Sequence, residues 1–312
     1  MTALEPTRHP RKPWLAGLLA MFVPGLGHLY AGRLVPGLLL PWLPGSLFLL
    51  LLAVTLGREA SSLALLVAIS LASLAVSVGQ VVWAVRAASV SKTGYVLRRY
   101  NSVLAYFGFT VASWLVGGGL SSSAKAFVVE SFKVPAASML PSILINDHVF
   151  ASKLGERNHS PRRGDMFVFR SPARPETNYI KRVVGLPGDT VAIVGGALQV
   201  NGQPVPRKAL GVQQHHDRVP DGPWVSVELE VFEESLDGAR YLAGVEGLPQ
   251  QDFGPEHVPE GHYFMLGDHR DNSQDSRHFG SVPAANLVGR VTGVWYSFGP
   301  DGMRWDRLGL RL

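Results

Sequence analysis

The sequence predicts two parts: N-terminal transmembrane helices in residues 1–125, then a mainly β domain outside the cytoplasm in residues 126–312. Hydrophobic residues make up 46% of the 312 residues and charged residues only 17%, and the long apolar segments all end by about residue 120. Beyond about residue 128 the apolar runs are short and are separated by Gly, Pro, Asn and Asp, as in an antiparallel sheet.

The composition excludes several kinds of chemistry. There is no cysteine, so the chain has no disulfide, no thiolate nucleophile and no cysteine-ligated zinc. The net charge is +5, but the cations are scattered or lie beside apolar segments, where they orient membrane spans rather than bind nucleic acid. We therefore expect membrane lipid, and no nucleic acid, among the partners of this chain.

Four apolar segments precede the β part, and they differ in how well they fit a membrane span. A helix needs roughly 20 apolar residues to cross a bilayer. The second and third segments are long enough, whereas the first, which contains Pro24-Gly25-Leu26-Gly27, and the fourth, which ends in Gly117-Gly118-Gly119, are marginal. The four segments comprise residues 14–30, 35–56, 63–85 and 103–120.

The charges of the loops give the orientation of these segments. The loop 86–100 carries four cations and is therefore predicted to be cytoplasmic, while the loop 57–60 is nearly neutral and can face outward. Counting crossings from these loops puts everything after about residue 121 outside and keeps the basic N-terminus inside. The first segment then does not cross, which leaves three spans; four spans with an outward N-terminus are the alternative. Both arrangements place the β domain outside the cytoplasm.

Eight short runs in the second part have the length and composition of strands. Gly195-Gly196 and Asn201-Gly202 flank one of them and are typical of two-residue hairpin turns. Residues from about 193 to 259 are rich in Gly, Pro, Gln and His and are predicted to form an inserted, smaller β subdomain. The predicted strands are residues 148–151, 166–169, 179–184, 190–194, 197–200, 225–231, 262–266 and 287–296.

Ser138 and Lys181 are the candidate nucleophile and base. A serine hydroxyl becomes a good nucleophile only when a neighbouring group takes its proton. Lys181 lies within an apolar run that ends at a turn of residues 185–189, so burial is expected to lower its pKa toward working pH. Neighbouring Arg182 should point the opposite way on a strand and remain solvated. Serines in loops and lone lysines are common, so this pair alone is weak support.

Two further blocks make the pair specific. The segments 132–142, 163–169, 179–189 and 267–277, in this order, resemble bacterial type I signal peptidases, which are membrane-bound Ser/Lys endopeptidases that remove secretory signal peptides. The resemblance extends from about Phe132 to Phe298. It implies the β fold of those peptidases, Ser138 as nucleophile and Lys181 as general base, and no metal or organic cofactor.

The resemblance also implies supporting roles. The serine matching Ser273 orients the lysine, and the aspartate matching Asp275 pairs with the arginine matching Arg277. Asp268 and Arg270 are expected to brace the same loop. Simple core packing is the alternative for the apolar positions that match the family's substrate pockets. The matching pocket positions are Phe132, Val134, Ala136, Met139, Ile143, Val149, Asn178, Tyr179 and Ile180.

Two positions depart from the family pattern. Ala136 stands where many members have a serine whose hydroxyl helps to stabilise the oxyanion, which leaves the backbone N–H of Ser138 as the main donor that can be named. His269 stands where asparagine is usual and is interpreted as a loop variant. His215-His216-Asp217 has no further ligands at strand or helix spacing, so a solvated loop is a better interpretation than a metal site.

The sequence therefore predicts a signal peptidase of the cytoplasmic (inner) membrane, with signal-peptide-bearing precursor proteins as substrates. Two other classes of protein are the alternatives. A self-cleaving Ser/Lys repressor would carry a DNA-binding segment where this chain has apolar segments. A catalytically weak or inactive homologue that acts as a membrane scaffold is favoured only by Ala136.

Overall fold

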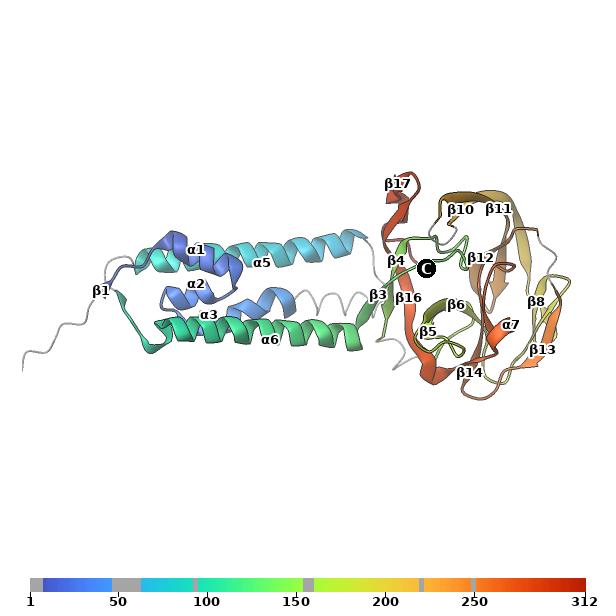
Figure 1. Ribbon diagram of the computed structural model, residues 1–312, viewed down its shortest axis with the longest axis horizontal. Helices are drawn as coiled ribbons and strands as arrows, with labels where there is room; N and C mark the ends of the chain where they lie inside the picture. The colour runs from blue at the N-terminus through green and yellow to red at the C-terminus, as the bar shows by residue number, and fades with distance from the viewer. Residues whose placement is uncertain (1–7, 47–62, 92–94, 154–159, 219–221, 248–250) are drawn as a thin grey trace, which may run out of the picture. The chain divides into compact units, whose positions relative to one another are not determined.

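The computed structural model describes residues 8–46, 63–91, 95–153, 160–218, 222–247 and 251–312 (Figure 1). The predicted outward loop 57–60, the second part of the predicted span 35–56 and Lys92 lie outside the described residues. Apart from the segment 56–63, the chain divides into two compact units, residues 1–125 and residues 126–312.

The first unit is helical. Its two long helices are α5 (Leu63–Val90) and α6 (Val103–Phe127), and both contain a stretch that is long and apolar enough to cross a membrane by length and composition. The fourth apolar segment, marginal in the sequence, is thus part of a 25-residue helix. The other described elements of this unit are β1 (Arg8–His9), α1 (Pro13–Phe22), α2 (Leu26–Tyr30), α3 (Leu34–Leu39), η1 (Leu40–Trp42), β2 (Tyr95–Val96) and η2 (Arg99–Asn101).

The first apolar segment is interrupted where Pro24-Gly25 predicts a break. α1 ends at Phe22 and α2 begins at Leu26, so neither helix has the roughly 20 residues that a full crossing needs. Gly25 has a φ of 88°, and a Cβ at this position would lie 2.2 Å from the carbonyl oxygen of Gly37. Only glycine fits a left-handed position that is also this crowded, which explains why the helix ends here.

The second unit is built on one antiparallel sheet of eight described strands. The strand order is β15-β14-β6-β5-β16-β4-β3, and β17 pairs with β16. Five of the predicted strands lie in this sheet, as β4, β5, β6, β14 and β16. The elements are β3 (Val129–Lys133), β4 (Asp147–Ser152), β5 (Met166–Arg170), β6 (Asn178–Gly185), β14 (His262–Leu266), α7 (Ser276–Phe279), β15 (Val282–Pro283), η3 (Ala284–Asn286), β16 (Leu287–Gly299), β17 (Gly302–Met303) and η4 (Trp305–Arg307).

Two smaller sheets occupy the region between β6 and β14. Their strand orders are β10-β11-β12 and β13-β7-β8-β9. Gly195 and Gly196, between β7 and β8, both have positive φ, as do Asn201 and Gly202 between β8 and β9, which confirms the two predicted hairpin turns. The strands are β7 (Thr190–Val194), β8 (Ala197–Val200), β9 (Gln203–Pro204), β10 (Arg207–Arg218), β11 (Trp224–Leu236), β12 (Ala239–Val245) and β13 (Phe253–His257).

The core of the second unit anchors the two segments that carry the candidate dyad. Met139 and Ile143, from the loop that contains Ser138, are buried in one apolar cluster, and Ile180, which precedes Lys181 in β6, packs against the same cluster. Each fully buried side chain of this kind stabilises the fold by about 1.5–3 kcal/mol. The nucleophile loop and the base-bearing strand are therefore held against a common core.

Candidate active site

Ser138 and Lys181 are in direct contact. Ser138 lies in a turn after β3, in which the N–H of Leu140 donates to the carbonyl of Ala137 at 2.9 Å. Lys181 lies within β6, and its Nζ is 2.5 Å from the Ser138 Oγ. The two residues are 43 positions apart in the sequence, so the fold makes this contact. A lysine at this distance can accept the hydroxyl proton when its amine is neutral.

Burial changes the acidity of Lys181. The residue is only 3% exposed, and this desolvation lowers its pKa from 10.5 to about 8. The carboxylates of Asp275 and Asp268 oppose part of the shift by raising the pKa, whereas Arg277 lowers it. A substantial fraction of Lys181 is therefore neutral at mildly alkaline pH, which is what a general base requires.

The segment 267–277 forms a third side of the site. The Asp275 carboxylate accepts hydrogen bonds from the Arg277 side chain at 2.7 and 2.8 Å and from the Gly267 N–H at 3.0 Å. Burial alone would raise the pKa of Asp275, but these hydrogen bonds hold that pKa below its ordinary value. Gly267 has no room for a side chain, because a Cβ there would lie 2.1 Å from the Ser273 Oγ and 2.5 Å from the Ser138 carbonyl oxygen.

Ser273 lies beside the dyad, but its expected hydrogen bond to Lys181 is not formed. Both residues line the same cleft, and Ser273 is 8% exposed. Its Oγ is buried and has no hydrogen-bond partner within the described part of the chain. The structure therefore brings Ser273 to the site without showing it orient the lysine.

A cleft of about 1240 Å³ surrounds the contact between Ser138 and Lys181. Two of the predicted pocket residues, Ile143 and Val149, do not line it, because both are fully buried in the core. The small sheets and their loops contribute cleft residues that the sequence did not indicate, among them Arg218. The predicted residues that do line the cleft are Phe132, Val134, Ala136, Met139, Asn178, Tyr179 and Ile180.

The family of this chain follows from its similarity to known proteins. Residues 109–296, more than half of the chain, match the family model described as signal peptidase, peptidase S26. The chain belongs to the peptidase S26 family. Signal peptidase I from Pseudomonas aeruginosa is 36% identical over 203 residues, which cover 57% of this chain and 68% of that protein. Signal peptidase I from Rickettsia typhi is 33% identical, with 55% of this chain and 74% of that protein covered.

One solved structure similar to this S26 peptidase is the crystal structure of a signal peptidase I from Enterococcus faecalis V583. It is 27% identical and covers 43% of this chain and 98% of that chain, with a TM-score of 0.27.

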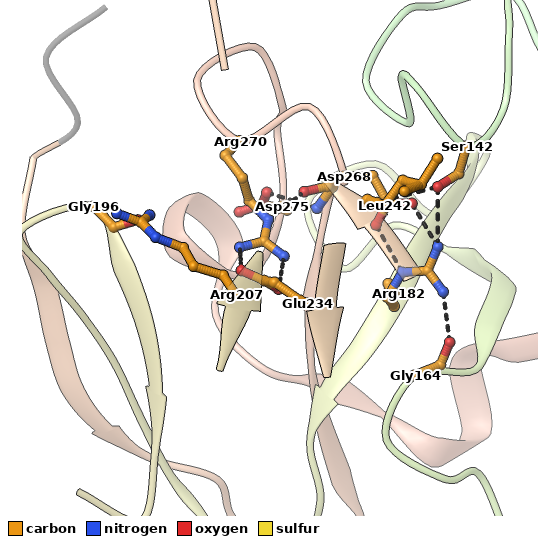
Figure 2. A network of polar contacts seen from close by, with 11 residues as sticks. Ser142, Gly164, Arg182, Gly196, Arg207, Glu234, Leu242, Asp268, Arg270 and Asp275 are labelled. Carbon is orange, nitrogen blue, oxygen red and sulfur yellow. Dashed lines mark hydrogen bonds and ion pairs between the residues drawn. The ribbon is translucent and has the colours of Figure 1, made fainter. Parts of the chain in front are cut away.

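The expectation that Arg182 is solvated is wrong in this S26 peptidase. Alternation along β6 directs Arg182 away from the face of Lys181, but that second face is covered, and Arg182 is only 4% exposed. Its guanidinium donates to the Asp268 carboxylate at 2.5 and 2.7 Å and to the Gly164 carbonyl at 2.6 Å (Figure 2). This pair ties β6 to the segment 267–277, which is the bracing role expected of Asp268.

Arg270 braces the same segment through a partner that the sequence did not reveal. Its guanidinium donates to both carboxylate oxygens of Glu234 in β11, at 2.5 and 2.8 Å, and both residues are almost fully buried (Figure 2). The N–H of Gly244 in β12 donates to the Asp268 carbonyl, and the N–H of Arg270 donates to the Gly244 carbonyl, each at 2.9 Å. The sheet β10-β11-β12 is therefore part of the support of the site in this S26 peptidase.

His215 and His216 lie in strand β10 rather than in the predicted loop. His215 is half-buried, and desolvation lowers its pKa. Among the residues that the structure describes, no group of three or more His, Asp or Glu is arranged to hold a metal ion.

Proposed function

We propose that this chain is a membrane-bound serine endopeptidase that removes signal peptides from secreted precursors, with Ser138 as nucleophile and Lys181 as general base. The observation that carries the proposal is the 2.5 Å contact between the Lys181 Nζ and the Ser138 Oγ, made by a buried lysine beside a large cleft. The naming of the relatives as signal peptidases supports the substrate class. Burying an amine costs free energy, so a scaffold without activity would gain nothing from it.

The proposed chemistry has two stages. Neutral Lys181 takes the hydroxyl proton of Ser138 as the Oγ attacks the carbonyl carbon of the scissile peptide, and the carbonyl oxygen becomes an oxyanion. Collapse of this intermediate breaks the C–N bond, and the Lys181 ammonium gives its proton to the leaving amine. Lys181 then deprotonates a water that attacks the ester, and Ser138 regains its proton as the acyl group leaves. The backbone N–H of Ser138, the nucleophilic residue, can donate a hydrogen bond to the oxyanion.

The test is cleavage of a precursor with an Ala-x-Ala cleavage site by the purified full chain, with the rate followed from about pH 6 to about pH 10. We expect one cut after the second alanine, identified by mass spectrometry. The rate should rise with pH through about 8, because Lys181 is a base only when neutral and burial lowers its pKa to about 8. Absence of cleavage, or a rate that rises only near the free-lysine value of about 10.4, would contradict the proposal.

We also propose that the peptidase unit lies outside the cytoplasm. The support is the concentration of cations on the loop 86–100, which favours a cytoplasmic position for that loop. A reporter fused after Leu120 is expected to be exposed outside. Because the chain has no cysteine, a single cysteine at Ser91 gives a clean probe, and we expect it to resist an impermeant thiol reagent in intact cells. Labelling of that cysteine would reverse the proposed orientation.

A further inference from the structure

His269 joins the Ser138 turn to two carboxylates. Its side chain is completely buried. The ring Nδ1 lies 3.3 Å from the carbonyl oxygen of Ala137, and the backbone N–H of His269 donates to the Ser138 carbonyl at 3.3 Å. On the other side of the ring, the Nε2 lies 3.0 Å from a carboxylate oxygen of Glu246 and 3.4 Å from one of Asp271. None of the steps proposed above uses this residue.

Both ring nitrogens of His269 therefore face acceptors. A carbonyl oxygen offers only lone pairs, so the hydrogen bond to Ala137 needs a proton on Nδ1. The Nε2 lies near the two carboxylates but makes no hydrogen bond within the described part of the chain, so the hydrogen bond of the ring is the one through Nδ1. A ring without a proton on Nδ1 would set a lone pair against the Ala137 carbonyl. The geometry thus places a ring N–H on the Ala137 oxygen.

The contacted carbonyl belongs to the peptide group that links Ala137 to Ser138. A peptide group is planar, and in its trans form the C=O and N–H point in opposite directions, so contacts on the Ala137 oxygen determine where the Ser138 N–H points. The N–H of Leu140 is a second donor to this oxygen, at 2.9 Å. On the opposite side, the Ser138 N–H has no hydrogen-bond acceptor among the described residues, and Ser138 lines the cleft. This N–H is therefore available to a substrate carbonyl oxygen.

We propose that His269 is a positioning residue for oxyanion stabilisation, an inference that rests on the proposed function. Its ring N–H aligns the peptide group between Ala137 and Ser138. A hydrogen bond on the Ala137 oxygen also polarises this peptide group, which makes the Ser138 N–H a stronger donor toward the oxyanion. Ala136, which also lines the cleft, offers no side-chain donor of its own. The contact of the His269 ring with the Ala137–Ser138 peptide group is therefore expected to affect the rate.

Two variants with amide side chains separate this role from simple packing. His269→Asn keeps a nitrogen near the place of Nδ1, whereas His269→Gln keeps one near the place of Nε2. For the full chain and the Ala-x-Ala precursor, we expect His269→Asn to stay within about threefold of wild type in kcat and His269→Gln to lose on the order of tenfold. Removing an entire oxyanion-hole donor typically lowers kcat by roughly 10²–10³-fold. The loss expected for His269→Gln is smaller, because the Ser138 N–H itself remains. KM should be unchanged, since the oxyanion exists only in the transition state and the intermediate.

The control for these variants is His257→Ala, at an exposed position of β13, which should keep the wild-type kcat. Equal kcat values for His269→Asn and His269→Gln would overturn the inference. Cleavage by Ser138→Ala would remove the proposed function and this inference together. If His269→Asn and His269→Gln have equal kcat values while Ser138→Ala is inactive, the inference about His269 is wrong and the proposed function stands.

A hydroxyl at position 136 should compensate for a weakened Ser138 N–H as a donor to the oxyanion. Ala136→Ser adds a hydroxyl in the cleft and is expected to raise kcat modestly in the otherwise unchanged chain. In the His269→Gln background the gain should be several-fold larger, because groups that act on one charge are not additive. The same factor of gain in both backgrounds would show that His269 and the oxyanion are independent, and would overturn the inference.

The protonation of the His269 ring can be measured without any assay of activity. The ¹⁵N spectrum of the histidine-labelled full chain reports which ring nitrogens carry protons, and the signal lost in His269→Asn identifies the residue. We expect a protonated Nδ1 throughout the pH range in which the precursor is cleaved. A Nδ1 without a proton in that range would overturn the inference, even if the glutamine variant failed to fold.

Discussion

Replacing Ser138 with alanine or Lys181 with methionine is expected to lower the rate of precursor cleavage by about 10³-fold or more. The two side chains act as one unit through their 2.5 Å contact, since the hydroxyl is a poor nucleophile without the amine and the amine has nothing to deprotonate without the hydroxyl. The double variant should therefore be no slower than either single variant. Single-turnover cleavage with enzyme in excess measures the chemical step directly.

Methionine at position 181 also separates loss of activity from loss of folding. Burial lowers the pKa of Lys181 to about 8, below the ordinary 10.5, so the folded state binds this proton less tightly than the unfolded state. The resulting destabilisation is complete below about pH 8 and fades as the pH rises toward 10.5. At about pH 7, Lys181→Met should therefore unfold at the same temperature as wild type or a higher one.

A matched lysine provides the control for this series. Lys153 forms an ion pair with Glu130 at 2.7 Å and does not line the cleft. Lys153→Met is therefore expected to keep wild-type cleavage. Near-wild-type turnover by Ser138→Ala or by Lys181→Met would rule out the proposed dyad.

Asp268→Ala is expected to have the largest effect on stability, lowering the free energy of unfolding of the peptidase unit by about 3–5 kcal/mol. The substitution leaves the Arg182 guanidinium buried, at 5% exposure of the side chain, without its carboxylate partner. For a unit of this size such a loss corresponds to a fall in the unfolding midpoint of roughly 6–20 °C. The shift of the midpoint can be measured by heating the full chain and monitoring the loss of cleavage activity.

Two controls distinguish a buried charge from a general effect of mutation. Asp301→Ala removes an exposed carboxylate of the same unit and should change stability by less than about 0.5 kcal/mol. Replacing both partners with apolar residues, Asp268→Leu with Arg182→Met, should destabilise less than Asp268→Ala alone, because no buried charge is left unpaired. A double variant at least as unstable as Asp268→Ala would show that the unpaired guanidinium is not the cause.

Strands with regular apolar runs were predictable from the sequence, whereas polar strands were not. All eight predicted runs lie in strands of the structure. β10 has 12 residues that are mostly exposed, so it shows neither an apolar run nor a clear alternation. It is held by antiparallel pairing with β11. Such pairing depends on a partner strand elsewhere in the chain, which local composition does not encode.

In the site, too, residues within contiguous sequence blocks were predictable, whereas contacts with distant elements were not. Ser138, Lys181 and the pair of Asp275 and Arg277 belong to contiguous blocks, and the structure brings these blocks together. The environment of Arg182 was predicted wrongly because alternation gives the direction of a side chain and not what covers that face of the strand. The partner of Arg270 likewise comes from β11, and spacing along the chain does not reveal a contact between such distant elements.

Lys181 and Arg182 are neighbours in one strand, and each is buried on its own face of β6, one against Ser138 and the other against Asp268. Because side chains alternate, a shift of strand register by one residue would exchange the two cations. A guanidinium does not lose its proton in a protein, so the shifted strand would offer the serine a permanent cation and no base. The alignment of β6 with β5, in which Lys181 pairs with Phe167, thus selects which of two adjacent cations can act as the proposed base.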